Sequence, residues 1–427
     1  MTHKVAIHWF RNDLRLRDNP SLAHAHTVSE EVLHLYVIDK RWDLTAEPGI
    51  PRIGDWRKRF ILEAVHALKH GLESRGNTLV IEKGEPHEVI SKWVSLTGAT
   101  LVTAQKEHTF EEVEQEDLVR EINDILLQTE ECISMVHPDD LPFHVKDTPS
   151  GFSRFRKIVE KNMGVRQPLD EPQGIKPAPP GIGNQPGSGI DPGAFPEPDA
   201  RAAIRWEGGE AEAWQHILEY IWEQRHITHY KETRNGLLGK DFSSKCSAWL
   251  SVGNLSARQL FHEIRLFEQE IIRNASTYWL VFELLWRDYF RFTAMKEGNV
   301  IFCGSGNSGN ELTGRKDKDL FMKWATGRTG NEFVDANMNE LRQTGFMSNR
   351  GRQNVASFLI HDLGVDWRWG AAWMEAWLTD YDVCSNYGNW RYIAGLTDRS
   401  ERHFDTADQA ARYDPDRRYR KTWLPEQ

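Results

Sequence analysis

The sequence predicts an α/β N-terminal domain built on a parallel, Rossmann-like sheet, followed by a C-terminal all-α domain. Short apolar segments rich in β-branched residues alternate with helical patterns early in the chain, and long helical periodicities dominate after residue 203. Between these parts, residues 164–200 hold nine of the chain's 18 prolines, which interrupts regular structure. We therefore expect an α/β domain over 1–140, a connector over 141–202 and a helical domain over 203–427.

The individual elements follow from local patterns, because apolar runs bounded by polar turns favour strands and a four-residue apolar repeat favours helices. A helix is expected from about Arg52, where Trp56, Phe60 and Ala64 begin such a repeat, and another over 110–127. The expected strands are 4–10, 32–38, 78–83 and 100–105. The expected helices of the second part include 211–225, 257–274, 276–296 and 355–363.

Composition narrows the class of protein. The 427 residues are 39% hydrophobic and 27% charged, and no apolar run approaches the roughly 20 residues of a membrane span. The N-terminus lacks the long apolar core of a signal peptide. The four cysteines are far apart, with no CxxC pair that would indicate a zinc site or a disulfide framework. We expect a cytoplasmic protein without membrane association and without a metal.

Charge and tryptophan content differ between the two parts. Of the net charge of −10, residues 1–200 carry −9 and residues 201–427 carry −1. Thirteen of the 17 tryptophans lie after residue 200. Helical packing accounts for many large aromatic residues, but this concentration also favours an aromatic-lined pocket. The acidic total does not exclude nucleic acid, because one basic face is enough to bind it.

Three polar clusters indicate where such a pocket lies. Asp380–Trp390 crowds carboxylates and amides directly after an aromatic stripe, and Gly345–Gln353 places two arginines on different sides of a helix. Ser243–Ser247 offers hydroxyl and backbone N–H groups suited to phosphate oxygens. Each cluster alone fits a helix cap or a solvated face. Together they indicate a polar, aromatic-walled cavity for a large phosphate-bearing cofactor.

Six segments in fixed order resemble the photolyase/cryptochrome family, and especially its DASH-type branch. The resemblance runs over essentially the whole chain. The segments are 9–19, 230–235, 276–290, 335–338, 345–353 and 384–390. The resemblance implies an α/β antenna domain, an all-α FAD-binding domain and blue-light-driven splitting of cyclobutane pyrimidine dimers.

The resemblance also implies roles for individual residues around FAD. Tyr230 and Ser243–Ser247 would hold the phosphates, and an Arg352–Asp380 pair would brace the pocket beside the ring. A guanidinium there would stabilise the negative charge of the reduced flavin. Asn386 would face the flavin N5. The expected FAD-binding residues are Tyr230, Ser243, Ser244, Lys245, Cys246, Ser247, Arg287, Phe346, Asn349, Arg352, Asp380, Asp382 and Asn386.

For DNA, the resemblance implies that Arg234 and Arg350 contact phosphates and that Glu283 hydrogen-bonds an extruded dimer. Gln353 and Tyr392 replace the Met and Trp of photolyases that act on duplexes, which favours dimers in single-stranded DNA. RNA is a second candidate partner, and a monomer is expected. The expected lesion-binding residues are Glu283, Trp286, Asn349, Gln353 and Tyr392.

Two further features were open from sequence alone. Glu107 matches the position where DASH-type proteins contact a methenyltetrahydrofolate antenna, although an ordinary surface glutamate is the alternative. The protein could also be a light sensor without repair activity; the chain's ending at Gln427, without a signalling tail, and the presence of Glu283 and Asn386 favour repair.

The family's relay of three tryptophans is incomplete in this sequence. Trp390 and Trp367 are present at the expected spacing, but Gly314 stands where the third is expected. We expect slow photoreduction of the flavin, with faster reduction in Gly314→Trp if that site has the family geometry. The candidate substitutes are Trp324, Trp369 and Trp373. Alternatively, Trp367 could itself be open to solvent.

Overall fold

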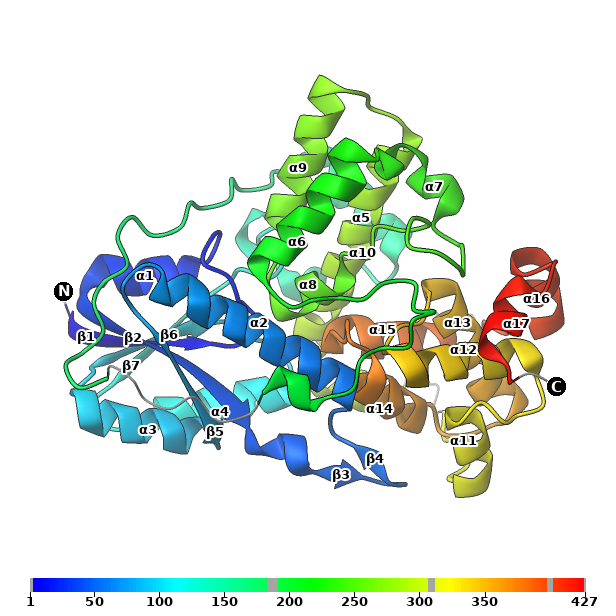
Figure 1. Ribbon diagram of the computed structural model, residues 1–427, viewed down its shortest axis with the longest axis horizontal. Helices are drawn as coiled ribbons and strands as arrows, with labels where there is room; N and C mark the ends of the chain where they lie inside the picture. Colours follow the sequence, from blue (N-terminus) through cyan, green and yellow to red (C-terminus); the bar gives the residue numbers. More distant parts are fainter. Residues whose placement is uncertain (1–2, 183–190, 306–311, 398–401, 426–427) are drawn as a thin grey trace.

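The computed structural model describes residues 3–182, 191–305, 312–397 and 402–425. Its N-terminal part contains a five-stranded, fully parallel sheet with the order β5-β2-β1-β6-β7 (Figure 1). In the register of the sheet, Ile7 pairs with Leu33 on one side and with Val102 on the other. The strands are β1 (His3–Phe10), β2 (Ser29–Asp39), β5 (Leu79–Gly84), β6 (Leu101–Gln105) and β7 (Leu126–Glu130), with a small separate hairpin of β3 (Thr45–Ala46) and β4 (Ile50–Pro51).

Helices cover both faces of this sheet, as parallel strands require. Helices α1 (Pro20–Val28) and α2 (Asp55–Glu73) lie on one face, and α3 (Pro86–Thr97) and α4 (Phe110–Arg120) lie on the other (Figure 1). The alternation along β1 explains the two cores. Phe10 packs with the α2 side chains, whereas Val5, Ile7 and Trp9 pack with those of α3.

The rest of the chain is helical, which confirms the predicted fold class. Helix α5 packs against α10, the long helix that runs through the domain. These helices are α5 (Phe152–Asn162), α6 (Glu210–Ile217), α7 (Tyr230–Thr233), α8 (Ser247–Val252), α9 (Ala257–Glu270), α10 (Ala275–Glu297), α11 (Lys318–Ala325), α12 (Glu332–Thr344), α13 (Asn349–Ser357), α14 (Trp367–Trp377), α15 (Val383–Ile393), α16 (Thr406–Tyr413) and α17 (Arg418–Trp423).

One expected element is wrong at its end. The helix predicted over 110–127 stops at Arg120, and the chain then forms β7, the edge strand beside β6. The β7 sequence Leu-Leu-Gln-Thr-Glu is half-polar and mostly half-buried, so it lacks the apolar run that identified the other strands.

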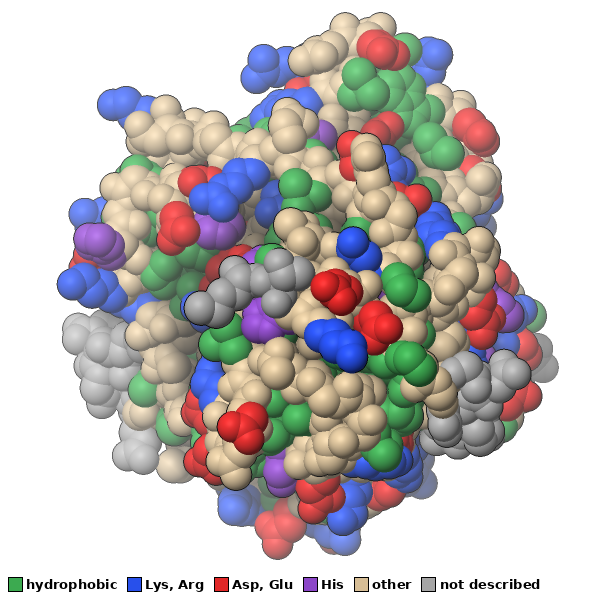
Figure 2. Space-filling model, turned by 90° about the vertical axis from the view of Figure 1, so that its left-hand side faces the viewer, with side chains coloured by type: hydrophobic (Ala, Val, Ile, Leu, Met, Phe, Trp, Pro, Cys, Tyr) green, Lys and Arg blue, Asp and Glu red, His purple; other side chains and the backbone are tan. Residues whose placement is uncertain are grey.

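The surface of the α/β domain shows no concentrated charge on the face seen in Figure 2. Lys and Arg side chains alternate there with Asp and Glu side chains, among the residues drawn in colour. Within the described ranges, no helix is long and apolar enough to cross a membrane.

Two buried histidines of the α/β domain lie in contact with each other. The Nε2 atoms of His26 and His34 lie 3.1 Å apart, and both side chains are buried. Burial disfavours the imidazolium and lowers the pKa of His26 to about 4 and that of His34 to about 3, with a further contribution at His34 from His26. In the unfolded chain both would titrate near 6.5.

We predict that the free energy of unfolding falls as the pH drops below about 6.5. Below this pH the unfolded chain binds protons that the folded protein does not. The free energy of unfolding therefore falls by about 1.4 kcal/mol per pH unit for each ring, until the pKa of the folded state is approached. Urea titrations between pH 7 and 4.5 measure this slope. His34→Phe should make it shallower, whereas a change at the exposed His70 to Gln should not. An unchanged slope in His34→Phe would refute this assignment.

Candidate functional site

A cavity of about 510 Å³ opens into the helical domain, within the usual size range of cofactor pockets. Helix α10 forms one wall, and the turn before α8 and the start of α13 form others. The structure brings most of the predicted residues to this one cavity. They are Tyr230, Arg234, Ser243, Ser244, Lys245, Cys246, Ser247, Glu283, Trp286, Arg287, Phe346, Asn349, Arg350, Arg352, Gln353, Asp380, Asp382 and Tyr392.

The segment 243–247 forms a tight turn directly before α8. Lys245 takes a left-handed backbone conformation with φ 49°, and its Nζ donates to the Lys240 carbonyl at 2.7 Å. The ammonium also lies 3.5 Å from the centre of the Phe242 ring. Burial lowers the pKa of Lys245 to about 7. Three serine hydroxyls and an amine therefore line one end of the cavity, where an anionic group fits.

At another part of the cavity wall, the Arg352 guanidinium is held by a carboxylate. Its Nη2 lies 2.9 Å from both oxygens of Asp380, whose side chain is buried. This bridge joins the first turn of α13 to the loop before α15 and fixes a positive charge at the wall. The predicted Arg352–Asp380 contact is thus present.

A smaller cavity of about 80 Å³ adjoins the first and shares Arg352, Asp380 and Asp382 with it. Asn386 and Trp390 line this inner space. The Asn386 amide donates to the Ala371 carbonyl at 3.0 Å, which fixes its orientation. Both residues lie on α15, four positions apart, so one helix face presents an amide and an indole to the same space.

Asp382 is held as an anion by two guanidinium groups. It caps α15 by accepting from Ser385 N, and Arg291 donates to its other oxygen at 2.8 Å. Burial alone would raise the pKa of Asp382, but Arg291 and Arg287 bring it below its usual value. Arg287 in turn donates to the Ile133 carbonyl at 2.7 Å, so the site is tied to the α/β domain.

Glu283 lies on α10 at the mouth of the same cavity. Its Oε1 accepts from Arg234 at 2.6 Å and from the Trp279 indole at 3.1 Å. Burial raises the pKa of Glu283 despite the opposing effect of Arg234. A carboxyl group at such a wall can accept hydrogen bonds from a planar polar ligand.

Aromatic rings and amides complete this wall. Trp286 stacks on Phe152 with ring centres 3.7 Å apart, and Tyr392 meets it edge-on at 5.9 Å. Gln353 accepts from Arg350 at 2.9 Å. A flat apolar surface beside fixed polar groups suits a nucleobase-like ligand.

The donor set of the cavity fits FAD. Lys245 and Arg287 supply positive charge for a diphosphate, and the serines supply hydroxyl donors. The apolar walls suit the adenine and isoalloxazine rings, and Asn349 and Asn386 supply amides for their edges.

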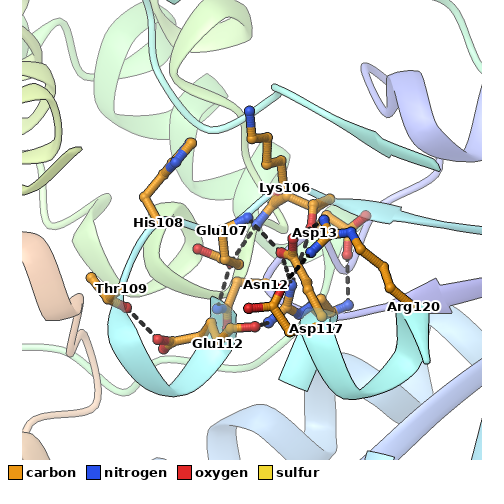
Figure 3. Close-up of polar contacts among 12 residues, drawn as sticks. Asn12, Asp13, Lys106, Glu107, His108, Thr109, Glu112, Asp117 and Arg120 are labelled. Carbon is orange, nitrogen blue, oxygen red and sulfur yellow. Dashed lines mark hydrogen bonds and ion pairs between the residues drawn. The ribbon is translucent and has the colours of Figure 1, made fainter. Parts of the chain in front are cut away.

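Glu107 is buried and already engaged by other side chains of the chain. Its side chain is only 4% exposed, so the alternative of an ordinary surface glutamate is wrong. Asn12 and Gln105 donate to its Oε1 at 3.0 and 2.8 Å, and Arg291 lies 3.7 Å from Oε2 (Figure 3 shows its surroundings). Glu107 lines none of the described cavities. These residues do not fit a folate contact as they stand.

The tryptophans of the expected relay are all buried. Trp367 is 1% exposed, so the idea that solvent reaches it directly is wrong. Trp390 meets Trp324 with ring centres 6.3 Å apart. Phe321 follows, at 5.8 Å from Trp324 and 5.4 Å from the half-buried Trp369. Of the three candidate substitutes, Trp324 is therefore the one in ring contact with Trp390.

Gly314 cannot hold a third tryptophan in this backbone. A Cβ added there would lie 2.4 Å from the Asp366 nitrogen, because Arg315 pairs closely with Val365. The condition for faster photoreduction in Gly314→Trp, a site that can take the side chain, is therefore not met in this structure.

We predict instead that even Gly314→Ala destabilises the protein, by about 1–3 kcal/mol, because backbone atoms must move. Thermal unfolding of the variant measures this. Gly49→Ala is no suitable control because its φ is 112°, whereas Gly164→Ala, which meets open space, should change little. An unchanged melting temperature in Gly314→Ala would contradict the prediction.

Two residues that the sequence analysis did not predict are important for the geometry of the site. Trp279 lines the cavity one helical turn before Glu283, and this spacing could have identified it. Arg291 reaches both Glu107 and Asp382. No local pattern signals this, since its partners come from distant parts of the chain.

Both parts of the chain match known proteins. Residues 6–173 match a family model described as DNA photolyase, and residues 279–427 match the FAD binding domain of DNA photolyase. The chain is 43% identical to a cryptochrome DASH from Gloeobacter violaceus, over all of this chain and 86% of that protein. A cryptochrome DASH from Natronomonas pharaonis is 45% identical over 99% of this chain and 90% of its own.

A solved structure is similar over the whole length as well. The crystal structure of a Synechocystis sp. PCC6803 cryptochrome superimposes with a TM-score of 0.94 and 40% identity, covering 100% of this chain and 89% of that one. The cavity therefore lies in a fold that solved relatives share.

Proposed function

Since the chain belongs to the photolyase/cryptochrome family and to its DASH branch, we propose that it binds FAD and uses blue light to split cyclobutane pyrimidine dimers in single-stranded DNA. One observation carries the proposal: most of the residues suited to a flavin and those suited to an extruded pyrimidine dimer line the same cavity. Splitting the dimer would restore two pyrimidines, and a reaction of this kind is a carbon–carbon lyase reaction.

In this proposal the chain's own residues hold and orient the cofactor. Ser243, Ser244 and Ser247 donate to the diphosphate, with Lys245 and Arg287 supplying positive charge. Arg352, fixed by Asp380, places a positive charge beside the ring, and Asn386 presents its amide to the ring edge. When bound, FAD supplies light absorption and electron donation to the lesion.

Lesion binding falls to the outer wall. Trp286 and Tyr392 offer aromatic faces on which a flipped dimer packs, and Glu283 accepts hydrogen bonds from its N–H groups. Asn349 and Gln353 lie close enough to line both the outer and the inner space. Arg234 and Arg350, at the cavity wall, would contact flanking phosphates.

The preference for single strands rests on Gln353 and Tyr392. Gln353 is already engaged by Arg350, and Arg402 lies over the Tyr392 ring at 3.8 Å. These contacts make the wall more polar than Met and Trp would. Extrusion from a duplex requires a few kcal/mol that single strands do not, so a weaker grip on the dimer penalises duplex substrates most.

The proposal is tested by illuminating the reduced flavoprotein with a thymine-dimer oligonucleotide and following the return of thymine absorbance. Repair that requires light is expected from the wild type, and Glu283→Ala should lose most of it. Light-dependent spectral changes of the protein without any restored thymine would favour the alternative function, a blue-light sensor without repair.

An antenna chromophore such as methenyltetrahydrofolate stays a separate prediction. At Glu107 it would require Asn12 and Gln105 to release the carboxylate, so no step is derived through it. A near-ultraviolet band in gently purified protein, lost on dialysis while the flavin stays, would support an antenna; a flavin-only spectrum would count against it.

A further inference from the structure

Two residues proposed for different tasks are bonded to each other at the mouth of the cavity. Arg234, which follows α7, donates from Nη1 to Glu283 Oε1 at 2.6 Å. The two side chains are 24% and 28% exposed, so DNA can reach both. A guanidinium held by a carboxylate is less available to a phosphate, and the carboxylate is less available to a base.

Trp279 holds this pair in place. Its indole donates to the same Glu283 oxygen at 3.1 Å, and its ring lies 5.2 Å from the Arg234 guanidinium carbon. Lys231 lies over the same ring at 4.9 Å. Within the described residues, nothing donates to Glu283 Oε2, so this oxygen can accept from a ligand while the Arg234 contact still exists.

Arg350, the second arginine expected to contact a DNA phosphate, has uncharged hydrogen-bond partners. Arg350 donates to Gln353 at 2.9 Å and to Asn235 at 3.0 Å, and its guanidinium lies over Tyr413. A phosphate can therefore bind Arg350 without separating an ion pair. The two arginines differ in the charge of their partners, although both line the same cavity.

We infer that Arg234 and Glu283 form a latch that couples phosphate binding to recognition of the lesion. In free protein and on undamaged DNA the latch stays closed, and Arg234 contributes little to phosphate binding. An extruded dimer carries two N–H groups: Glu283 Oε2 accepts one, and Oε1 accepts the other in place of Arg234, which frees the guanidinium for a flanking phosphate. Arg234 and Trp279 thus act as positioning residues that favour damaged over undamaged strands. The inference rests on the proposed function.

Binding in the dark tests the latch without any catalytic step. The FAD-loaded protein is titrated with a labelled single-stranded oligonucleotide, undamaged or carrying one thymine dimer, at several salt concentrations. In Glu283→Gln we expect tighter binding of the undamaged strand by about three- to tenfold. The slope of the logarithm of the binding constant against the logarithm of the salt concentration should steepen by about 0.7, the value for one more phosphate contact in single strands. Binding of the dimer strand should weaken.

The double variant separates a latch from a general loss of negative charge. If Glu283→Gln acts by freeing Arg234, it should give no gain in affinity for the undamaged strand in an Arg234→Gln background. In an Arg350→Gln background, the matched control, the gain should remain. A gain that persists without Arg234, or a change below twofold in wild-type background, would overturn the latch. Flavin content and melting temperature confirm that each variant is folded.

The outcomes also separate the latch from the proposed function. If wild type binds neither oligonucleotide, both are rejected. If wild type prefers the dimer strand but Glu283→Gln leaves undamaged binding unchanged, only the latch is rejected.

Discussion

Trp390→Phe is expected to abolish light-driven reduction of the bound flavin while FAD stays bound. Trp390 lines the inner cavity, and it packs so closely on α14 that a Cβ at Gly370 would lie 2.3 Å from its ring. Phenylalanine fills similar space but is far harder to oxidise, so the first donor is lost. The rate of flavin bleaching under blue light with an external thiol measures the effect.

The next donors can be told apart with the same assay. Trp324 is in ring contact with Trp390, so Trp324→Phe should slow reduction if electrons enter by way of Trp369. Trp367→Phe should slow flavin reduction if electrons reach Trp390 by way of Trp367 instead. Flavin reduction at the wild-type rate in Trp390→Phe would contradict these expectations. A second contradicting result has two parts: the wild type is reduced as fast as a relative with three relay tryptophans, and the Trp324→Phe, Trp369→Phe and Trp373→Phe variants lose no reduction rate.

Asp380→Ala is expected to cause the largest loss of stability and of bound FAD. Its carboxylate makes two 2.9 Å contacts with Arg352, and removal leaves a guanidinium without its counter-charge at the cavity wall. Breaking a fully buried pair costs about 3–5 kcal/mol. Because the Arg352 side chain is 28% exposed, we expect about 2–3 kcal/mol here.

The flavin-to-protein absorbance ratio and chemical unfolding measure both effects. The matched control is Glu171→Ala, which breaks the exposed pair between Glu171 and Arg75. Surface pairs contribute about 0–1 kcal/mol, and this one lies far from the cavity residues in sequence. Wild-type flavin content in Asp380→Ala would show that the bridge is dispensable.

Much of the fold was predictable because its signals are local. The apolar segments that became β1, β2, β5 and β6 are buried on both faces, so they read as continuous runs. Strand β7 was missed because it lies at the edge of the sheet and is half-polar, and so it was absorbed into the preceding helix.

The site was predictable where a single segment carries several functional groups, as in Ser243–Ser247 and Asp380–Trp390. It was not predictable where distant segments meet. Nothing in the neighbourhood of Glu107 indicates that Asn12 and Arg291 surround it, and nothing near Gly314 indicates that the Asp366 backbone fills the space of a side chain.

The most direct test compares repair of one thymine dimer in a single strand and in the matched duplex, with the reduced wild-type protein under blue light. We predict rapid return of thymine absorbance in the single strand, none in the dark, and little in the duplex. Extrusion from the duplex requires additional free energy, which binding to the wall with Gln353 and Tyr392 must supply. Equal rates on both substrates would contradict the strand preference. No restored thymine on either, from protein that carries FAD and binds the strand, would contradict the repair function itself.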